Sequence, residues 1–145
     1  MFTNAELLEQ LPSIVNLPPR YVEIAEFGQE DFNIPEAEET IEIHRGRKAD
    51  FEDALQFWIR SLQSRDWNGG DYFVNYAKDS KCLPLSDDGF KRLIAYYSHS
   101  LAKPLSLAPR GKFQSGMQMC DEWNDAAIIA EFEDEYVAFY WVTTA

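Results

Sequence analysis

A short basic segment contains one of the two histidines of the chain. Residues 44–48 read His-Arg-Gly-Arg-Lys, and no other segment groups cationic side chains as densely. The planar guanidinium groups of Arg45 and Arg47 can each donate two parallel hydrogen bonds to a phosphate or carboxylate. The segment therefore predicts an anion-binding site formed by His44, Arg45 and Arg47. The alternative is a solvated loop, or an internal partner for acidic residues elsewhere in the chain.

Other side chains that enzymes commonly use give little support for catalysis. His99 falls opposite the apolar stripe of a predicted helix, so we expect it to be exposed. Cys82 and Cys120 form no Cys-x-x-Cys pair and lie near no histidine at metal-ligand spacing, which predicts reduced core thiols and no metal site. Glycine-rich phosphate loops, nucleophile elbows and metalloprotease motifs do not occur in the sequence. We therefore expect no cofactor, and a non-catalytic protein is favoured over an enzyme.

Carboxylates outnumber all other ionisable groups. The chain has 25 Asp and Glu against 13 Lys and Arg, for a net charge of −12, which predicts neither a nucleic-acid nor a membrane partner. Residues 1–44 carry −9, residues 45–112 carry +4 and residues 113–145 carry −7. The acidic ends can fold against the basic middle and be neutralised. Otherwise an acidic face remains and meets a basic protein partner through complementary potential.

These side chains must be positioned by one domain of ordinary size, because 145 residues suit a single hydrophobic core. No apolar run reaches the roughly 18 residues of a membrane span. The first residues also lack the basic and apolar regions of a secretory signal. We therefore expect a soluble, cytoplasmic protein.

Two segments have the apolar spacing of helices with one buried face. In residues 50–65 the apolar side chains recur at i, i+3, i+4 and i+7, and Asp50 is expected to cap the helix. A second helix is predicted to begin at Ser86 or Asp87, either of which can cap it. Its apolar stripe continues to about Leu101.

The N-terminal region is expected to contribute one or two further helices. Thr3 and Glu6 have the spacing of a capping box, and Pro12 is expected to end the short helix that they begin. Residues 21–28 follow a proline and end in glycine, which favours a helix. Their partial alternation of apolar and acidic side chains also allows a strand.

The C-terminal part is rich in strand-forming residues. The segments 126–132 and 136–142 predict a β-hairpin, with 113–119 as a possible third strand, and residues 40–45 alternate as a strand does. The hairpin strands are apolar on both faces, so they should lie inside a sheet that helices cover. The predicted fold is a single α+β domain over residues 1–145, with helices packed on an antiparallel sheet completed by the C-terminal hairpin.

Several aromatic residues exceed what the predicted helix stripes need. Phe57 and Tyr96 fall outside the core-facing stripes of their helices, and Trp67, Trp123 and Tyr140 add to this surplus. These rings either extend the core of a three-layer domain or mark an interface, since Trp, Tyr and Phe are common anchors of binding surfaces.

The sequence favours a non-catalytic acidic interaction module, such as an inhibitor, an immunity-type protein or an adaptor. It would bind a basic protein partner through aromatic rings and the carboxylates around the predicted hairpin turn, namely Phe57, Tyr96, Glu131, Glu133, Asp134 and Glu135. The alternative is a small-molecule-binding protein or small enzyme with an aromatic-lined pocket between helices and sheet, using His44, Arg45 or Arg47. A homo-oligomer that joins its copies through the surplus aromatics is a third hypothesis.

Overall fold

One antiparallel sheet forms the centre of this computed structural model, which describes residues 1–18, 22–65 and 72–144. Its strands are β1 (Glu23–Phe27), β2 (Thr40–Arg47), β3 (Leu83–Leu85), β4 (Phe113–Glu122), β5 (Asp125–Phe132) and β6 (Glu135–Val142). They lie in the order β1-β2-β6-β5-β4-β3. The predicted strand over 40–45, the C-terminal hairpin β5-β6 and the third strand beside it are therefore confirmed.

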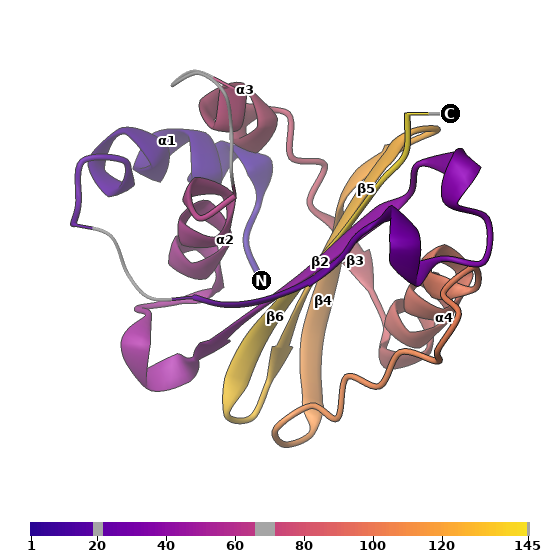
Figure 1. Cartoon of the computed structure of the whole chain (residues 1–145). Helices are drawn as coiled ribbons and strands as arrows, with labels where there is room; N and C mark the ends of the chain where they lie inside the picture. Colours follow the sequence, from indigo (N-terminus) through magenta and orange to yellow (C-terminus); the bar gives the residue numbers. More distant parts are fainter. Residues whose placement is uncertain (19–21, 66–71, 145) are drawn as a thin grey trace.

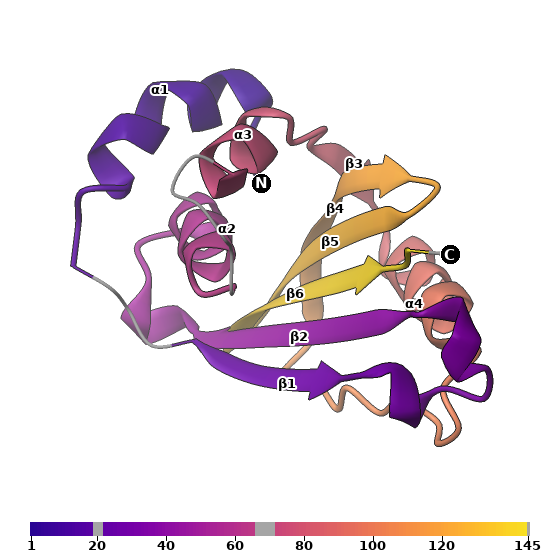
Figure 2. The same ribbon diagram turned by 45° about the horizontal axis from the view of Figure 1, so that its top comes forward.

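Helices cover both faces of the sheet, as Figures 1 and 2 show. They are α1 (Asn4–Ile14), α2 (Ala54–Gln63), α3 (Tyr72–Lys78) and α4 (Asp87–Ser98). Single 3-10 turns occur at η1 (Gln29–Asp31), η2 (Pro35–Ala37) and η3 (Lys48–Asp50). In Figure 1, α1, α2 and α3 lie on one side of the sheet and α4 lies on the other. The predicted α+β fold is confirmed.

The hairpin strands β5 and β6 are central, with β4 and β2 as their outer neighbours. Side chains on both of their faces are buried, because each face meets a separate helical layer. Toward α2 they present Ile129 and Tyr140, and toward α4 they present Ile128 and Phe139. A buried position on both faces explains why these strands are almost continuously apolar.

Residues 23–27 form the edge strand β1, so the helix favoured for residues 21–28 is wrong over the part that the structure describes. Ile24 pairs with His44 and Phe27 with Ile41 along β2. This pairing joins segments about 20 residues apart in sequence and supplies backbone hydrogen bonds that the local sequence does not reveal. Residue 21 lies outside the described residues.

Helix α1 continues through Pro12 to Ile14, so the expected end at Pro12 is wrong. Proline removes one backbone donor, whose acceptor would be the carbonyl of Leu8. Leu8 is 43% exposed, which leaves that carbonyl on the solvent side of the helix. Leu11 and Ile14 are buried on the opposite side, and their packing holds the last turn. The N-terminal cap is as predicted, since Thr3 accepts a hydrogen bond from the Glu6 amide.

Helix α2 is buried along almost its whole length, and it differs from two expectations. Its cap is Asp53, which accepts from the Gln56 amide at 2.8 Å, and not Asp50, which lies at the end of η3. Phe57 is only 1% exposed and stacks on Tyr136 with ring centroids 5.4 Å apart. The Phe57 ring is buried because Tyr136 of the sheet and Phe51, whose ring centroid lies 5.3 Å away, enclose it. Helices α1 and α3 cover the side of α2 away from the sheet (Figure 2).

Helix α4 has one face free of other helices. Its cap is Ser86, as predicted, and accepts from the Gly89 amide at 3.0 Å. The helix ends at Ser98, before Leu101, whose backbone instead forms a β-bridge with Phe32. None of the helices formed by the described residues has the length and apolar character that crossing a bilayer requires.

Candidate functional site

Strand β2 separates the side chains that the basic segment was expected to bring together. Alternate residues of a strand point to opposite faces. His44 points toward α2 and is completely buried, whereas Arg45 pairs with Glu135 on the other face. Arg45 and Arg47 line a shallow depression that also contains acidic residues, namely Glu23, Asp50 and Glu135. The three predicted anion-binding residues therefore do not share one site.

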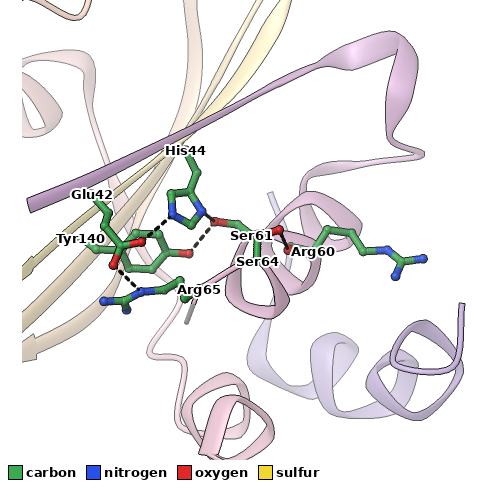
Figure 3. A network of polar contacts seen from close by, with 7 residues as sticks. All are labelled: Glu42, His44, Arg60, Ser61, Ser64, Arg65 and Tyr140. Atoms are coloured by element: carbon green, nitrogen blue, oxygen red, sulfur yellow. Dashed lines mark hydrogen bonds and ion pairs between the residues drawn. The ribbon is translucent and has the colours of Figure 1, made fainter. Parts of the chain in front are cut away.

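His44 instead belongs to a buried chain of hydrogen bonds (Figure 3). The Ser61 hydroxyl lies 2.6 Å from the Tyr140 hydroxyl and 2.7 Å from His44 Nδ1. On the other side of the ring, His44 Nε2 lies 3.1 Å from a carboxylate oxygen of Glu42. Arg65 donates to the second oxygen of Glu42 at 3.2 Å. With a neutral imidazole carrying its proton on Nε2, each group in this chain has a partner.

The connectivity is that of a Ser-His-carboxylate nucleophile, but its location does not suit catalysis. Ser61, His44 and Tyr140 are each 0% exposed. None of the four main depressions formed by the described residues is lined by Ser61 or His44. The Ser61 oxygen is also engaged by the buried Tyr140 hydroxyl. The network therefore connects α2 to strands β2 and β6.

The charge of Glu42 completes this network. Burial disfavours its ionised form, but the hydrogen bond from His44 and the positive charge of Arg65 outweigh that effect and lower the pKa of Glu42 below its ordinary value. Arg65 also lies over the Tyr140 ring, 4.2 Å from its centroid. Glu42 is therefore held as a carboxylate that accepts from both neighbours.

The carboxylates at the β5-β6 turn are less available than expected. Glu135 is only 2% exposed and accepts two hydrogen bonds from Arg45, at 2.8 and 3.0 Å. Glu131 pairs with Lys48 at 2.6 Å. Glu133 accepts from the Lys112 amide and stays exposed, as does Asp134. At this turn the basic middle segment folds against the acidic C-terminal part. Glu135 is therefore buried and does not lie on an open surface.

Replacing Arg45 with glutamine is expected to destabilise the protein at pH 7 and much less at pH 3. Burial disfavours the Glu135 carboxylate, but hydrogen bonds from Arg45 and from the Arg110 amide outweigh it and lower the pKa of Glu135. The pair therefore contributes stability above the ordinary glutamate pKa of about 4.3, and this is lost as the pH falls through the lower folded pKa. Removing Arg45 leaves the buried Glu135 carboxylate without its cationic partner, although the Arg110 amide still donates to it, and this costs roughly 2–3 kcal/mol at neutral pH.

Urea unfolding at both pH values measures this effect. Arg47→Gln is the matched control, because Arg47 lies in the same strand and is exposed. Its free energy of unfolding should change by less than about 0.5 kcal/mol. An Arg45→Gln loss of equal size at pH 7 and pH 3 would contradict the role given to the Glu135 charge.

A different surface combines exposed aromatic rings with carboxylates. Trp123 is 73% exposed and Tyr96 is 66% exposed, the two highest values for large hydrophobic residues in the described part of the chain. Both line one depression of about 280 Å³. We call it the aromatic-acidic depression, and it is formed by Glu39, Tyr96, Tyr97, His99, Asp121, Glu122, Trp123 and Trp141.

Four separate segments build the aromatic-acidic depression. Helix α4 contributes Tyr96 and Tyr97, whose ring centroids lie 5.0 Å apart, and Trp141 of β6 follows 4.9 Å from Tyr97. Trp141 donates its indole N–H to Glu39 at 2.9 Å, which fixes that carboxylate beside the rings. The last residues of β4 and the turn to β5 complete the depression with Asp121, Glu122 and Trp123.

The depression has a negative potential. Among the described residues that line it, three are carboxylates and none is Lys or Arg. Burial and the nearby charge of Asp121 raise the pKa of Tyr97. His99 is exposed, as predicted, and is the one lining residue that can carry positive charge there.

The structure exposes some of the surplus aromatic residues and buries others. Tyr96 and Trp123 are exposed, as the interface interpretation requires, whereas Phe57 and Tyr140 are core residues, as the interpretation of an extended core requires. Trp67 lies outside the described residues. The sequence does contain a signal for the site, Asp-Glu-Trp-Asn at residues 121–124, where a tryptophan stands in a polar turn between two strands.

Both cysteines are poor candidates for nucleophiles. Burial raises the pKa of Cys82 to about 11 and also raises the pKa of Cys120. Neither thiol has a disulfide partner in this structure. Over residues 1–18, 22–65 and 72–144, no three His, Cys, Asp or Glu side chains are placed to hold a metal ion.

Comparison with known proteins adds no relative to this description. No family model matches the chain. No curated protein and no solved structure matches it significantly either. The function must therefore be argued from the residues and surfaces described above.

Proposed function

We propose that this protein is a non-catalytic interaction module that binds a basic protein partner through the aromatic-acidic depression. One observation supports this most strongly: the two most exposed large hydrophobic side chains of the described residues, Tyr96 and Trp123, line the same depression as three carboxylates. Isolated exposed hydrophobic residues are normal on a soluble protein. Exposed aromatic rings that share a depression are typical of a binding surface.

The chemistry of the depression suits a lysine or arginine side chain. A cation over an exposed tryptophan or tyrosine ring gains about 0.5–1 kcal/mol, and more when water is excluded. Glu39, Asp121 and Glu122 would accept its hydrogen bonds, which are stronger when both groups are charged. Tyrosine and tryptophan are also the residues most often found at the energetic centre of protein interfaces. An inhibitor, an immunity-type protein or an adaptor is the class of module that we propose.

The predicted carboxylates at the other hairpin turn do not belong to this surface. The β4-β5 turn and the β5-β6 turn lie at opposite ends of β5, whose eight residues span about 25 Å. Glu133 and Asp134 therefore contribute to the overall negative field, which speeds the encounter with a basic partner, without contacting the same group.

Titration with an oligo-arginine peptide tests the proposal, with an oligo-glutamate peptide as the negative probe. The arginine peptide should bind and weaken as salt is added, because exposed charge pairs are screened. The variant Asp121→Lys/Glu122→Lys should lose most of the affinity. The charge-matched control Glu133→Lys/Asp134→Lys changes the net charge by the same amount and should keep most of it.

The two double variants separate a site from a general charge effect. Equal losses in both would mean that the peptide responds only to the net charge of −12. Unchanged binding in both would mean that the carboxylates of the depression do not contact it. Either result would overturn the proposal.

A further inference from the structure

A second and larger depression lies between α4 and the segment that follows it. It has a volume of about 640 Å³, and its lining is mainly apolar. Phe90, Ile94, Leu101 and Phe132 form its buried floor, with exposures of 2–8%. We call it the apolar groove. Its volume is within the range of small-molecule sites, which is about 300–1,000 Å³.

The outer wall of the apolar groove is an irregular segment that is held at its ends. The Ala102 amide donates to the carbonyl of Asp31 at 2.9 Å, and Arg45 donates to the carbonyl of Ala108 at 3.1 Å. Between these contacts, Leu105 and Leu107 pack against the core on the α4 side. The wall is therefore positioned by apolar contacts that an aliphatic ligand could share.

Most residues that line the groove come from a part of the chain without acidic residues. Residues 89–120 contain five Lys and Arg and no Asp or Glu, although the whole chain carries −12. Lys91 and His99 line the groove, and Lys103 is exposed in the segment that forms the wall. Among the described lining residues, Asp87 has the one carboxylate, and it pairs with Lys91 at 3.3 Å where both side chains are exposed. Such a pair is weak, so an anionic ligand can compete for Lys91.

We propose that the apolar groove binds the anion of a fatty acid, with the acyl chain on the floor and the carboxylate at Lys91, which lines the groove, and at Lys103 in the neighbouring wall segment. An aliphatic chain suits a groove that offers few hydrogen-bonding groups and several buried apolar surfaces. A folded protein partner would need about 800 Å² of interface on each side, which requires a surface that extends well beyond this one depression. The lining of the two depressions differs: the groove is mainly apolar and has Lys91 at its edge, whereas the aromatic-acidic depression has three carboxylates and no Lys or Arg among its described residues.

Calorimetric titration with three amphiphiles of equal chain length tests both parts of the proposal. Dodecanoate, dodecanol and dodecyltrimethylammonium are added below the concentrations at which they form micelles. Dodecanoate should bind with a stoichiometry of one to one and bind about tenfold more tightly than the cationic amphiphile. Absence of dodecanoate binding, or equal affinity for all three head groups, would overturn the proposal.

Two variants locate the ligand. Ala95→Trp places a large ring into the groove from an exposed position of α4 and should abolish dodecanoate binding. Ala5→Trp, at an exposed position of α1, is the matched control. Lys91→Glu/Lys103→Glu should weaken dodecanoate by about tenfold and leave dodecanol unchanged. Unaltered binding in Ala95→Trp, or an equal loss for dodecanoate and dodecanol in the charge variant, would contradict the assignment.

Discussion

Replacing both Tyr96 and Trp123 with alanine is expected to weaken binding of a Lys- and Arg-rich partner by about two to three orders of magnitude. Truncating a central aromatic anchor commonly costs about 2 kcal/mol or more, and two anchors in one depression act on the same partner group. Both side chains are exposed, so the free energy of unfolding should change by less than about 0.5 kcal/mol. Calorimetric titration with the oligo-arginine peptide measures the loss.

A matched pair elsewhere on the surface controls for the removal of apolar area. Leu8 and Leu83 are exposed by 43% and 50%, and they lie on α1 and β3, outside the aromatic-acidic depression. Leu8→Ala/Leu83→Ala should leave peptide affinity unchanged. Equal affinities of the two double variants would show that Tyr96 and Trp123 are not anchors.

Replacing His44 with leucine is expected to destabilise the protein by about 3 kcal/mol. The substitution removes the hydrogen bond of His44 to the buried Ser61 hydroxyl, which keeps only its contact with Tyr140, and the hydrogen bond of His44 to one oxygen of Glu42. Each such loss costs about 1–3 kcal/mol. The packing volume changes little, so the loss reports mainly on hydrogen bonding. Urea unfolding measures it, with His99→Leu as an exposed control that should stay within about 0.5 kcal/mol of the parent.

The same variant distinguishes a structural network from a catalytic one. A serine activated for catalysis would react with an organophosphonate reagent, and the reaction would depend on His44. The burial of Ser61 predicts no labelling of the folded protein. Labelling of Ser61 together with a loss below about 1 kcal/mol in His44→Leu would contradict the structural role.

The elements that the sequence predicts well are those whose pattern is local. The helix cap at Ser86 and the apolar runs of β5 and β6 depend on neighbouring residues, and their positions agree with the structure. Strand β1 and the full burial of Phe57 depend on segments that are distant in sequence. The helical spacing of apolar residues identifies one buried face of α2. It does not show that other parts of the chain pack on the remaining faces of this helix.

The candidate site was only partly predictable for the same reason. Tyr96 could be placed outside its helix stripe from spacing alone. Glu39 and Asp121 are about 80 residues apart and meet only through the sheet topology. Likewise, the bond between Arg45 and Glu135 crosses 90 residues, so the sequence could not show that this carboxylate is neutralised.

Charge compensation and a remaining acidic surface both occur, at different ends of the sheet. At the β5-β6 turn, Lys48 and Arg45 pair with Glu131 and Glu135. At the β4-β5 turn, the depression keeps its carboxylates beside exposed rings. The net charge of the chain therefore says less about a binding surface than the local pairing does.

The signal of the Trp123 indole N–H in a ¹⁵N-resolved NMR titration with oligo-arginine tests the central proposal most directly. Binding at the aromatic-acidic depression predicts that this resonance and the backbone amides of Tyr96 and Glu122 shift most. A titration that moves the amides of Glu133 and Asp134 while Trp123 stays in place would contradict it.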